Sequence, residues 1–349
     1  MNLLYSNTPN PIIYERFIAI RKYVEADTKI YYIQRKESKI SLPFLKNKNI
    51  KQIFEVKDTR GKIFSKIFYI SKTAFHIYKK KLEKVYCFYP DMLLASVLAK
   101  ILNPKLKIYY EIQDLNDVNC FFRALHCILM LFSKKIFITS PLFKDEFKPY
   151  FKHLSKRTIF IGNGPMRSLW KDKLGKTKTS KDTTIGFVGM LRDLDHVSQI
   201  RELLEKTSYK VIQAGVCIFP EEIKALQKKF PERLKVITKF NPENLYEKIY
   251  PLIDIVWSCY PNNRNYCLHI SRRFTDAITL NRYVIVSDHS KFMNSNSIKI
   301  KYKNVLSYQE FKNMNSESGS EIKELEFKWV ANEFEFENGI ESFINAINE

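Results

Sequence analysis

The sequence lacks several features that would place it in familiar structural classes. It has only nine glycines and 13 prolines in 349 residues, which excludes collagen-like and low-complexity chains. No apolar run reaches the roughly 18 residues that a membrane-spanning helix requires, and the longest candidate, Ala124–Phe132, is half that length. The N-terminus, Met-Asn-Leu-Leu-Tyr-Ser, lacks the basic and apolar regions of a secretory signal. We therefore expect a cytoplasmic protein.

Metal ligands are equally sparse. The six cysteines are scattered without a Cys-x-x-Cys pair, and the six histidines form no ligand pair at helical spacing. Asp193 and Asp195 match a two-carboxylate pattern that can hold a divalent cation. Because they directly follow an expected strand, capping of the next helix is the favoured interpretation. The sequence predicts no metal site and no cofactor.

The composition is that of a globular protein. Hydrophobic residues make up 45% of the chain and aromatic residues 14%, which excludes an intrinsically disordered protein. A chain of 349 residues exceeds the usual limit of about 250 to 300 residues for a single core. Two domains are therefore expected.

Short apolar runs alternate with helical segments along both halves of the chain, which indicates βαβ units and parallel sheets. Strands are predicted in the first half at 2–5, 29–33, 85–89, 107–112, 136–139 and 158–161, with helices at 12–25, 62–80, 92–101 and 121–132. Strands are predicted in the second half at 184–188, 210–213, 234–237, 253–257 and 283–287, and a last helix at 339–348.

The polar, basic and aperiodic segment 171–182 interrupts this alternation and is typical of a linker. The pattern predicts a first Rossmann-like domain at 1–165, a linker at 166–182, and a second Rossmann-like domain at 183–338. The helix at 339–349 is expected to pack back on the first domain. Two such doubly wound domains would face a cleft lined by the carboxyl ends of their strands, where the ligands of these sheets bind.

The basic charge is concentrated in the first half. Residues 1–165 carry 30 Lys and Arg against 13 Asp and Glu, a net +17 of the formal +21 of the whole chain. Such asymmetry indicates an anionic partner, either a membrane surface or nucleic acid, and a codon bias that raises Lys is the alternative explanation. The runs Lys79–Lys81 and Lys46, Lys48 and Lys51, interleaved with aromatic residues, suit an anionic lipid surface. No recognised nucleic-acid motif is present.

The segment Ser271-Arg272-Arg273-Phe-Thr-Asp276 carries the most chemistry. It is typical of a helix capped by Ser271 with two arginines in the first turn, and free N–H groups at such an end attract phosphate. Arginine adds bidentate donors to a diphosphate, and Asp276 is placed to accept the hydroxyls of a ribose. An alternative is a surface helix with an Arg272–Asp276 ion pair at i,i+4 spacing.

This segment, continued to Ala277, Asn281 and Val284-Ile285, resembles the Pro-Asn-Lys-x-x-Glu-Ala-x-x-x-Gly-x-Pro-Val-Ile motif of retaining GT-B glycosyltransferases. Three further stretches resemble that family in the same order, at 107–115, at 138–164 and at 185–192. The resemblance implies a donor diphosphate site. Its residues would be Gly189, Arg192, Ser271, Arg272, Arg273 and Asp276.

Acceptor-side residues are expected in the first half. Glu15 and Arg16 begin a helix predicted to face the cleft, Gln113 stands where the family has a histidine, and Asp114 ends a central strand. Asp114 is the best-placed catalytic base for an inverting transfer, with a turn-forming aspartate as the alternative.

The resemblance implies a metal-independent enzyme that transfers a sugar from a nucleotide diphosphate sugar to a lipid-linked or other cell-surface glycan, at the inner face of the cell membrane. Leu268 stands where the family has its first motif glutamate, and no glycine-rich loop follows the first strand. An inactive homologue is therefore one alternative. Others are a nucleotide-sugar epimerase of the same fold and a basic protein that binds nucleic acid or another anionic surface.

Overall fold

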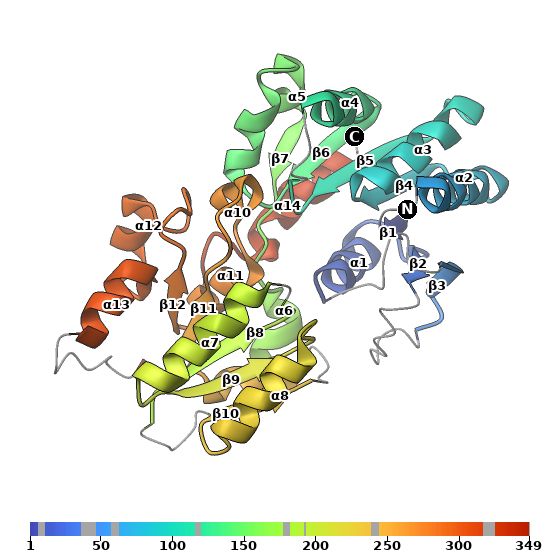
Figure 1. Cartoon of the computed structure of the whole chain (residues 1–349). Helices are drawn as coiled ribbons and strands as arrows, with labels where there is room; N and C mark the ends of the chain where they lie inside the picture. The colour runs from blue at the N-terminus through green and yellow to red at the C-terminus, as the bar shows by residue number, and fades with distance from the viewer. Residues whose placement is uncertain are drawn as a thin grey trace. The chain divides into compact units, whose positions relative to one another are not determined.

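The computed structural model describes residues 1–5, 11–35, 47–56, 63–115, 120–176, 182–191, 193–238, 244–316 and 325–348. The chain forms two compact units (Figure 1). Unit 1 comprises Met1–Gly162 and Phe336–Glu349, and unit 2 comprises Asn163–Glu335. Each unit is built on its own parallel sheet flanked by helices, so the predicted α/β fold class with two parallel-sheet domains is confirmed.

The sheet of unit 1 has the order β3-β2-β1-β4-β5-β6-β7, and all its strand pairs are parallel. Its strands are β1 (Asn2–Tyr5), β2 (Lys29–Arg35), β3 (Ile50–Val56), β4 (Lys84–Phe88), β5 (Lys107–Ile112), β6 (Ser133–Ile138) and β7 (Thr158–Phe160). The strand order reverses between β1 and β4, which is the topological switch point of a doubly wound sheet.

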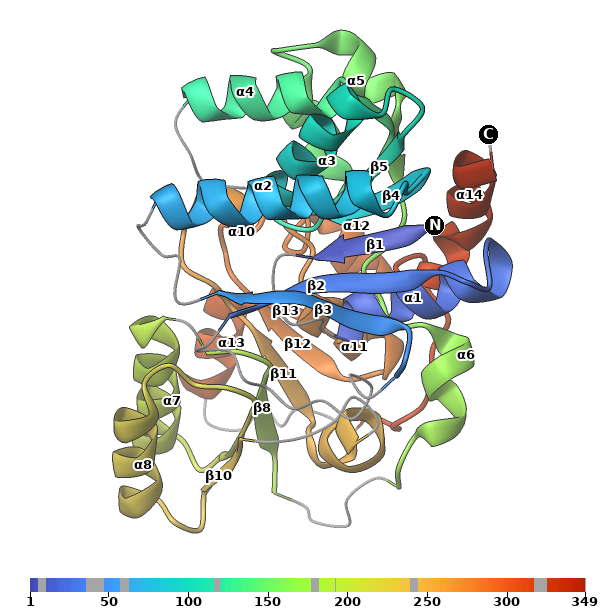
Figure 2. The ribbon, with the colours of Figure 1, turned by 90° about the vertical axis from the view of Figure 1, so that its right-hand side faces the viewer.

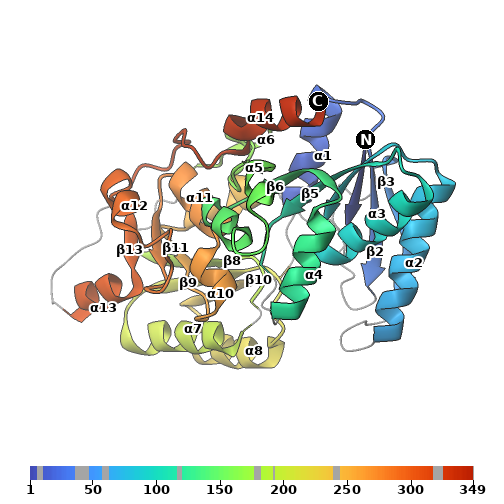
Figure 3. The same ribbon diagram turned by 90° about the horizontal axis from the view of Figure 1, so that it is seen from above.

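Helices cover both faces of this sheet. They are α1 (Pro11–Tyr23), α2 (Ile63–Lys79), α3 (Pro90–Leu102), α4 (Cys120–Met130), η3 (Pro141–Phe147), α5 (Lys152–Lys156) and α14 (Phe336–Asn348). Helices α2, α3 and α4 form one layer, while α1 and α14 lie on the opposite face (Figures 2 and 3). Helix α2 connects β3 to β4, which lies on the other side of β2 and β1 in the sheet. Because such crossovers are right-handed, α2 and the two helices after it lie on the opposite face from α1.

Helix α14 brings the end of the chain into unit 1. Its Phe343 ring lies 5.5 Å from the ring of Tyr86 and 4.9 Å from that of Phe137. The hydroxyl of Tyr109 donates to the carbonyl of Ile347 at 2.9 Å. A helix distant in sequence therefore completes the core of the first sheet.

The sheet of unit 2 has the order β10-β9-β8-β11-β12-β13, again all parallel. Its strands are β8 (Thr184–Val188), β9 (Lys210–Ala214), β10 (Leu234–Ile237), β11 (Ile255–Ser258), β12 (Tyr283–Val286) and β13 (Val305–Ser307). Its helices are α6 (Arg167–Trp170), η4 (Lys171–Lys173), α7 (Leu194–Lys206), α8 (Pro220–Lys229), η5 (Leu245–Ile249), η6 (Tyr250–Leu252), α10 (Arg264–Leu268), α11 (Arg272–Thr279), α12 (Asn296–Lys301) and α13 (Tyr308–Ser316).

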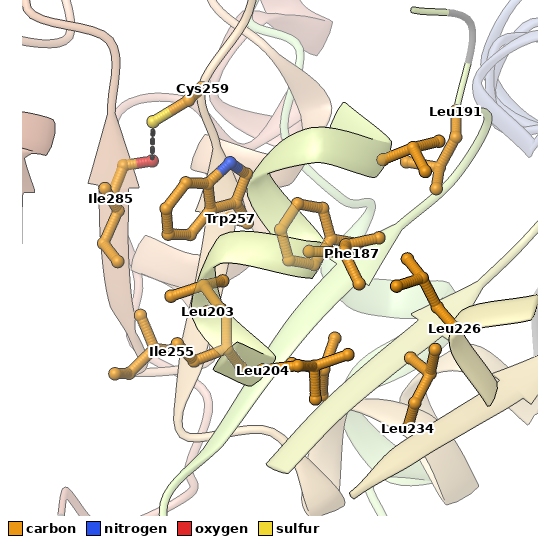
Figure 4. Packing of buried hydrophobic residues seen from close by; sticks show 14 of the residues in the cluster. Phe187, Leu191, Leu203, Leu204, Leu226, Leu234, Ile255, Trp257, Cys259 and Ile285 are labelled. Carbon is orange, nitrogen blue, oxygen red and sulfur yellow. Dashed lines mark hydrogen bonds between the residues drawn. The ribbon is translucent and has the colours of Figure 1, made fainter. Parts of the chain in front are cut away.

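The core of unit 2 lies between this sheet and α7 (Figure 4). The ring of Phe187 from β8 stacks on that of Trp257 from β11 at 5.2 Å, and both side chains are almost fully buried. Leu203 and Leu204 of α7 cover them. The strand order of the sheet reverses between β8 and β11, and this ring contact packs those two strands together.

The segment predicted as a linker, 166–182, differs from that expectation in its described part. Arg167–Trp170 and Lys171–Lys173 form helical turns, and residues 166–176 and 182 belong to unit 2. The Trp170 ring, 3% exposed, stacks on that of Tyr246 at 5.2 Å. One buried aromatic residue therefore ties the segment to unit 2, although the charged residues around it suggest a solvated linker.

Two strands were not predicted from the sequence. Strand β3 lies at the edge of the sheet and carries Lys51, Gln52 and Glu55. Because of these polar residues, it lacks the continuous apolar run by which the buried strands were predicted. Strand β13 has three residues, too few to show a period. Among the helices of the described ranges, none has the length and hydropathy of a membrane span.

Candidate functional site

The candidate site lies in unit 2, at the carboxyl ends of β8 and β11. These strands are neighbours at the point where the strand order reverses, which is where doubly wound sheets bind ligands. Gly189, directly after β8, has a φ of +96°, a conformation that side chains with a Cβ rarely adopt. Its N–H donates to the Ala214 carbonyl at 2.7 Å. Beyond Gly189 the chain stays beside the segment that follows β9, because the N–H of Leu191 donates to the Val216 carbonyl at 2.9 Å.

Helix α11 begins beside this turn. Ser271 is its N-cap, and the Ser271 hydroxyl accepts a hydrogen bond from the N–H of Phe274 at 3.1 Å. The same hydroxyl lies 2.6 Å from that of Ser258, the last residue of β11. The end of the strand thus positions the start of the helix, where backbone N–H groups and the helix dipole attract anions.

Arg273 projects from the first turn of α11 toward Gly189. Its Nη2 donates to the Met190 carbonyl at 3.0 Å, and its guanidinium carbon lies 5.3 Å from the centre of the Tyr260 ring. A Cβ on residue 189 would lie 3.7 Å from Nη2, an ordinary contact distance, so the positive φ and not the space beside Arg273 favours glycine here. Arg273 is 7% exposed, and its Nη1 has no hydrogen-bond partner among the described residues.

A buried charged N–H group without a partner is costly, and proteins keep such groups where a ligand completes them. The unpartnered Nη1 of Arg273 lies with the start of α11 at the carboxyl edge of the sheet. Together they form a site suited to an anion with several oxygens, such as a phosphate group.

His196, in the first turn of α7, belongs to the same edge and was missed by the sequence analysis. It is 2% exposed, and its Nε2 lies 2.8 Å from the carbonyl oxygen of Cys259, so Nε2 is the protonated nitrogen. Its Nδ1 lies 3.8 Å from the carboxylate of Asp193. Burial and the neighbouring Arg273 lower the pKa of His196 below its ordinary value of 6.5, which favours the neutral ring.

Asp193 occupies the N-cap position of α7, as the favoured interpretation required, but its side chain makes no capping hydrogen bond. Its proximity to His196 is therefore the more informative contact. The only signal for His196 in the sequence is its position directly after Asp195. A sequence pattern cannot show that this ring turns toward β11.

Arg272 and Asp276 form the i,i+4 ion pair that was one of the two sequence interpretations. Arg272 Nε donates to Asp276 Oδ1 at 2.8 Å. Two tyrosine hydroxyls donate to the same carboxylate, Tyr246 at 3.0 Å and Tyr250 at 2.7 Å. Asp276 is 2% exposed. The structure gives this carboxylate a network of protein donors, and the ribose contact stays a prediction.

The two tyrosines were also not predicted. Tyr246 lies in η5, a turn of π-helix, and Tyr250 begins η6 directly after it. Single π-turns commonly occur where side chains must be brought to a functional site. The two tyrosines are four residues apart, and both hydroxyls reach Asp276, which lies in a different helix. Their spacing therefore indicates a shared face but not the carboxylate that they contact.

The remaining predicted donor residue, Arg192, lies outside the described residues. Arg273 lies beside Gly189, Ser271 caps the helix that carries Arg273, and the Arg272 and Asp276 side chains pair with each other. Their binding of a donor stays a prediction. The described residues contain no group of three or more His, Cys, Asp or Glu side chains that could hold a metal ion.

In unit 1, the acceptor-side prediction needs correction. Glu15 and Arg16 lie inside α1 and are both 0% exposed, so they do not face an open site. Arg16 Nε lies 3.1 Å from Oε2 of Glu111, and Tyr86 donates to the same carboxylate at 2.5 Å. Gln113 donates to Glu111 as well, at 3.0 Å. Arg16, Tyr86 and Gln113 thus surround the buried carboxylate of Glu111, which needs donors around its charge.

Asp114, the predicted base, is half-buried just beyond the end of β5. The lysines at 48, 51 and 79–81 are exposed, and Lys46 lies outside the described residues. Of the predicted acceptor-side and catalytic residues, Gln113 and Asp114 are thus partly exposed, whereas Glu15 and Arg16 are not.

No protein-family model matches the chain, and no curated protein matches its sequence. Solved structures do match it. A glycosyltransferase from Rickettsia africae is 13% identical with a TM-score of 0.57, over 99% of this chain and 93% of that one. The lipopolysaccharide outer core galactosyltransferase WaaB is 11% identical with a TM-score of 0.55, over 100% and 99% of the two chains. The fold is GT-B.

The same GT-B fold occurs in enzymes of another class. The UDP-GlcNAc 2-epimerase from Methanocaldococcus jannaschii is 14% identical to this chain with a TM-score of 0.58, over 100% of this chain and 99% of that one. Identities this low establish the fold alone. The chemistry of this chain must therefore be argued from its own residues.

Proposed function

We propose that this protein is a glycosyltransferase that uses a nucleotide diphosphate sugar as donor. The observation that carries the proposal is the buried, unpartnered Nη1 of Arg273 at the start of α11, at the switch point of a GT-B sheet. Structures with this fold include a complex with UDP-2-fluoro glucose and one with UDP-GlcNAc, which supports a nucleotide sugar as the ligand.

In this proposal the donor diphosphate lies against the start of α11. Arg273 and the N–H groups of the first helical turn neutralise the charge that develops on the leaving nucleotide, without a metal ion. Gly189 allows the diphosphate to approach the backbone, Ser271 positions the helix, and Arg192 adds a further cation. Arg272 and Asp276 hold α11 in place, and Asp276 reaches the ribose if its network opens.

The acceptor is proposed to be a lipid-linked or other cell-surface glycan, and the first domain, 1–165, is proposed to bind it at the inner face of the cell membrane. Two observations support this: the net +17 of residues 1–165, and the fold shared with a lipopolysaccharide galactosyltransferase. Asp114 is the proposed base for the acceptor hydroxyl in an inverting transfer.

Calorimetric titration with UDP and a panel of nucleotide sugars tests the donor site. We expect Arg273→Ala to weaken UDP binding by about a hundredfold, because a charge-assisted bidentate contact is lost. Arg201→Ala, at an exposed arginine of α7 in the same unit, is the matched control and should bind UDP normally. Equal affinities for the Arg273→Ala variant and the wild-type protein would refute the donor site.

A nucleotide-sugar epimerase is the second candidate, and His196 is the observation that favours it. An epimerase needs side chains that accept and return a proton, and a neutral His196 beside Asp193 supplies such a pair at the same strand edge. Three of the matching structures are named for UDP-GlcNAc 2-epimerases or bind UDP, each covering most of this chain.

Product analysis separates the two candidates. Transfer or hydrolysis releases free UDP from the donor, whereas epimerisation leaves an intact sugar nucleotide with an altered sugar. An epimerase would lose turnover but retain UDP binding in a His196→Gln variant. UDP binding without either product from any donor would indicate an inactive homologue.

A further inference from the structure

Helix α2 has its largest apolar side chains on the outside. Its exposed face carries Phe64, Ile67, Phe68 and Phe75, whose exposed fractions are 84%, 55%, 56% and 60%. These positions recur at the spacing of one helical face. Its buried face instead contains Tyr69, Thr73, Ala74 and Ile77. The helix therefore presents large apolar side chains to the outside as well as to the protein core.

Helix α4 continues the pattern in the same layer. Phe121, Phe122, Leu125 and Ile128 are each 40% exposed or more, on one side of the helix. Between α2 and α4 lies α3, whose last turn exposes Ile101 and Leu102 at 68% and 60%. Figure 2 shows the three helices stacked side by side on one face of the sheet of unit 1. We call these exposed side chains of α2, α3 and α4 the apolar face.

The apolar face is specific to unit 1. Among the described residues, 19 large hydrophobic side chains are exposed, of which five lie on α2, three on α3 and four on α4. Unit 2 exposes five, none of them aromatic. Scattered exposed apolar residues need no explanation, but a concentration on three adjacent helices marks a contact surface.

The charge around the apolar face indicates what it contacts. Neither α2 nor α4 contains an acidic residue, whereas α2 carries Lys66, Lys72 and Lys79. The Lys72 ammonium lies 4.5 Å from the centre of the Phe68 ring, so its aliphatic stem runs along the apolar side chain. Aromatic residues on one face flanked by lysines are typical of helices that lie in the interface of a bilayer.

A hollow at one end of the apolar face adds further positive charge. It lies where α2 and α3 end, and Tyr78 and Leu102 line it together with one carboxylate, Glu83. Asn103 and Pro104 also line it, together with four lysines: Lys81, Lys84, Lys105 and Lys107. Apolar walls beside several ammonium groups suit lipid phosphates at the surface of a membrane.

We propose that the apolar face inserts into the surface of an anionic phospholipid bilayer. The inference deepens the membrane attachment put forward under the proposed function, and assigns it to the aromatic side chains of α2, α3 and α4 rather than to charge alone. The lysines attract the anionic headgroups, and Phe64, Phe68 and Phe121 enter the boundary with the acyl chains.

Sedimentation of the full-length protein with vesicles tests this assignment. Vesicles of phosphatidylcholine mixed with phosphatidylglycerol should bind the protein, and vesicles of phosphatidylcholine alone should bind it more weakly. We expect Phe64→Ser combined with Phe68→Ser to lower the partition coefficient at least about tenfold, because two large apolar side chains no longer leave water. Ile300→Ser, at a 70% exposed residue of unit 2, is the matched control and should bind as the wild type does.

A second measurement locates the contact. All three tryptophans of the chain lie in unit 2, so Phe68→Trp introduces a fluorescent reporter on the apolar face. Brominated lipids should quench this added fluorescence and leave that of the wild-type protein nearly unchanged. Vesicle binding by the double serine variant equal to that of the wild type would overturn the proposal. So would concentration-dependent dimers that this variant abolishes, without any vesicle binding, because the face would then join two copies of the chain.

The donor site can be scored separately in the same samples. The double serine variant should bind UDP as the wild type does, since its changes lie in unit 1. Loss of vesicle binding with UDP affinity retained supports the membrane face. Vesicle binding by a protein that binds no UDP would leave this inference standing and refute the proposed function.

Discussion

The Nε of Arg272 lies 2.8 Å from Oδ1 of Asp276, one turn further along α11. The same arginine donates to the carbonyls of Asn163, at 3.4 Å, and Gly164, at 3.2 Å, where the chain enters unit 2. Asp276 therefore holds an arginine that ties the helix of the candidate site to the first residues of its unit. The pair therefore has a structural role that does not depend on contact with a ligand.

Replacing Asp276 by Asn should destabilise unit 2 by about 3 kcal/mol, because the guanidinium of Arg272 would lose its charged partner in a largely buried setting. Tyr250→Phe, which removes one neutral donor from the same carboxylate, should cost about 1 kcal/mol. Urea denaturation followed by tryptophan fluorescence measures both, since the three tryptophans report on unit 2. An unchanged unfolding free energy for Asp276→Asn would show that the Arg272–Asp276 pair does not stabilise unit 2.

Ser271→Ala and Ser258→Ala form a matched pair. Both remove the contact between the two hydroxyls, but only Ser271→Ala also removes the cap on the N–H of Phe274. We expect Ser271→Ala to cost about 1 kcal/mol more than Ser258→Ala in the unfolding free energy of unit 2. UDP affinity should fall in the same order, because the cap positions the anion-binding end of α11. Equal effects would show that the cap contributes nothing.

Gly189→Ala should impair both folding and donor binding. A side chain at a φ of +96° strains the backbone by about 1–2 kcal/mol, and the added methyl group would lie against Arg273. Thermal unfolding and UDP titration of this variant measure the two effects. A variant with normal UDP affinity would show that the diphosphate does not approach the backbone here.

His126 makes unit 1 sensitive to acid. Burial lowers its pKa from 6.5 to about 4, and its Nε2 lies 2.9 Å from the hydroxyl of Tyr110. The unfolded chain binds this proton below pH 6.5 while the folded chain stays neutral to about pH 4. The stabilising effect of the neutral ring is therefore complete above pH 6.5 and declines as the pH falls toward 4.

Scanning calorimetry across this pH range tests the assignment to His126. The wild-type protein should lose thermal stability as the pH falls, and His126→Gln should lose less, because glutamine does not titrate. Identical slopes for the two proteins would assign the acid sensitivity to other groups.

The sequence was a good guide to strands buried on both faces. Thr184–Val188 and Lys107–Ile112 were predicted with the bounds that the structure has, because central parallel strands are continuous apolar runs. It was a poor guide to the edge strand Ile50–Val56. This edge strand carries Lys51, Gln52 and Glu55 and pairs with one neighbour, β2, so it lacks the continuous apolar run of a central strand.

The burial of individual charged side chains could not be predicted from the sequence either. Glu15 and Arg16 are charged residues near the start of a helix, a position that favours exposure, yet both are fully buried. A charge enters a protein interior only when partners meet it, and Glu111 of β5 supplies that partner for Arg16. Composition and residue spacing do not show which charged side chains from different elements come into contact.

By itself, the sequence determined the α/β class, the two parallel sheets and the helix that carries Ser271 and Arg273, since periodicity and capping are local properties. It also determined that the excess positive charge belongs to the first half. Tertiary structure alone decided that Arg273 meets Gly189 and that the aromatic side chains of α2 face outward. Both depend on which surfaces the sheets and helices leave uncovered, and packing between elements distant in the sequence sets that.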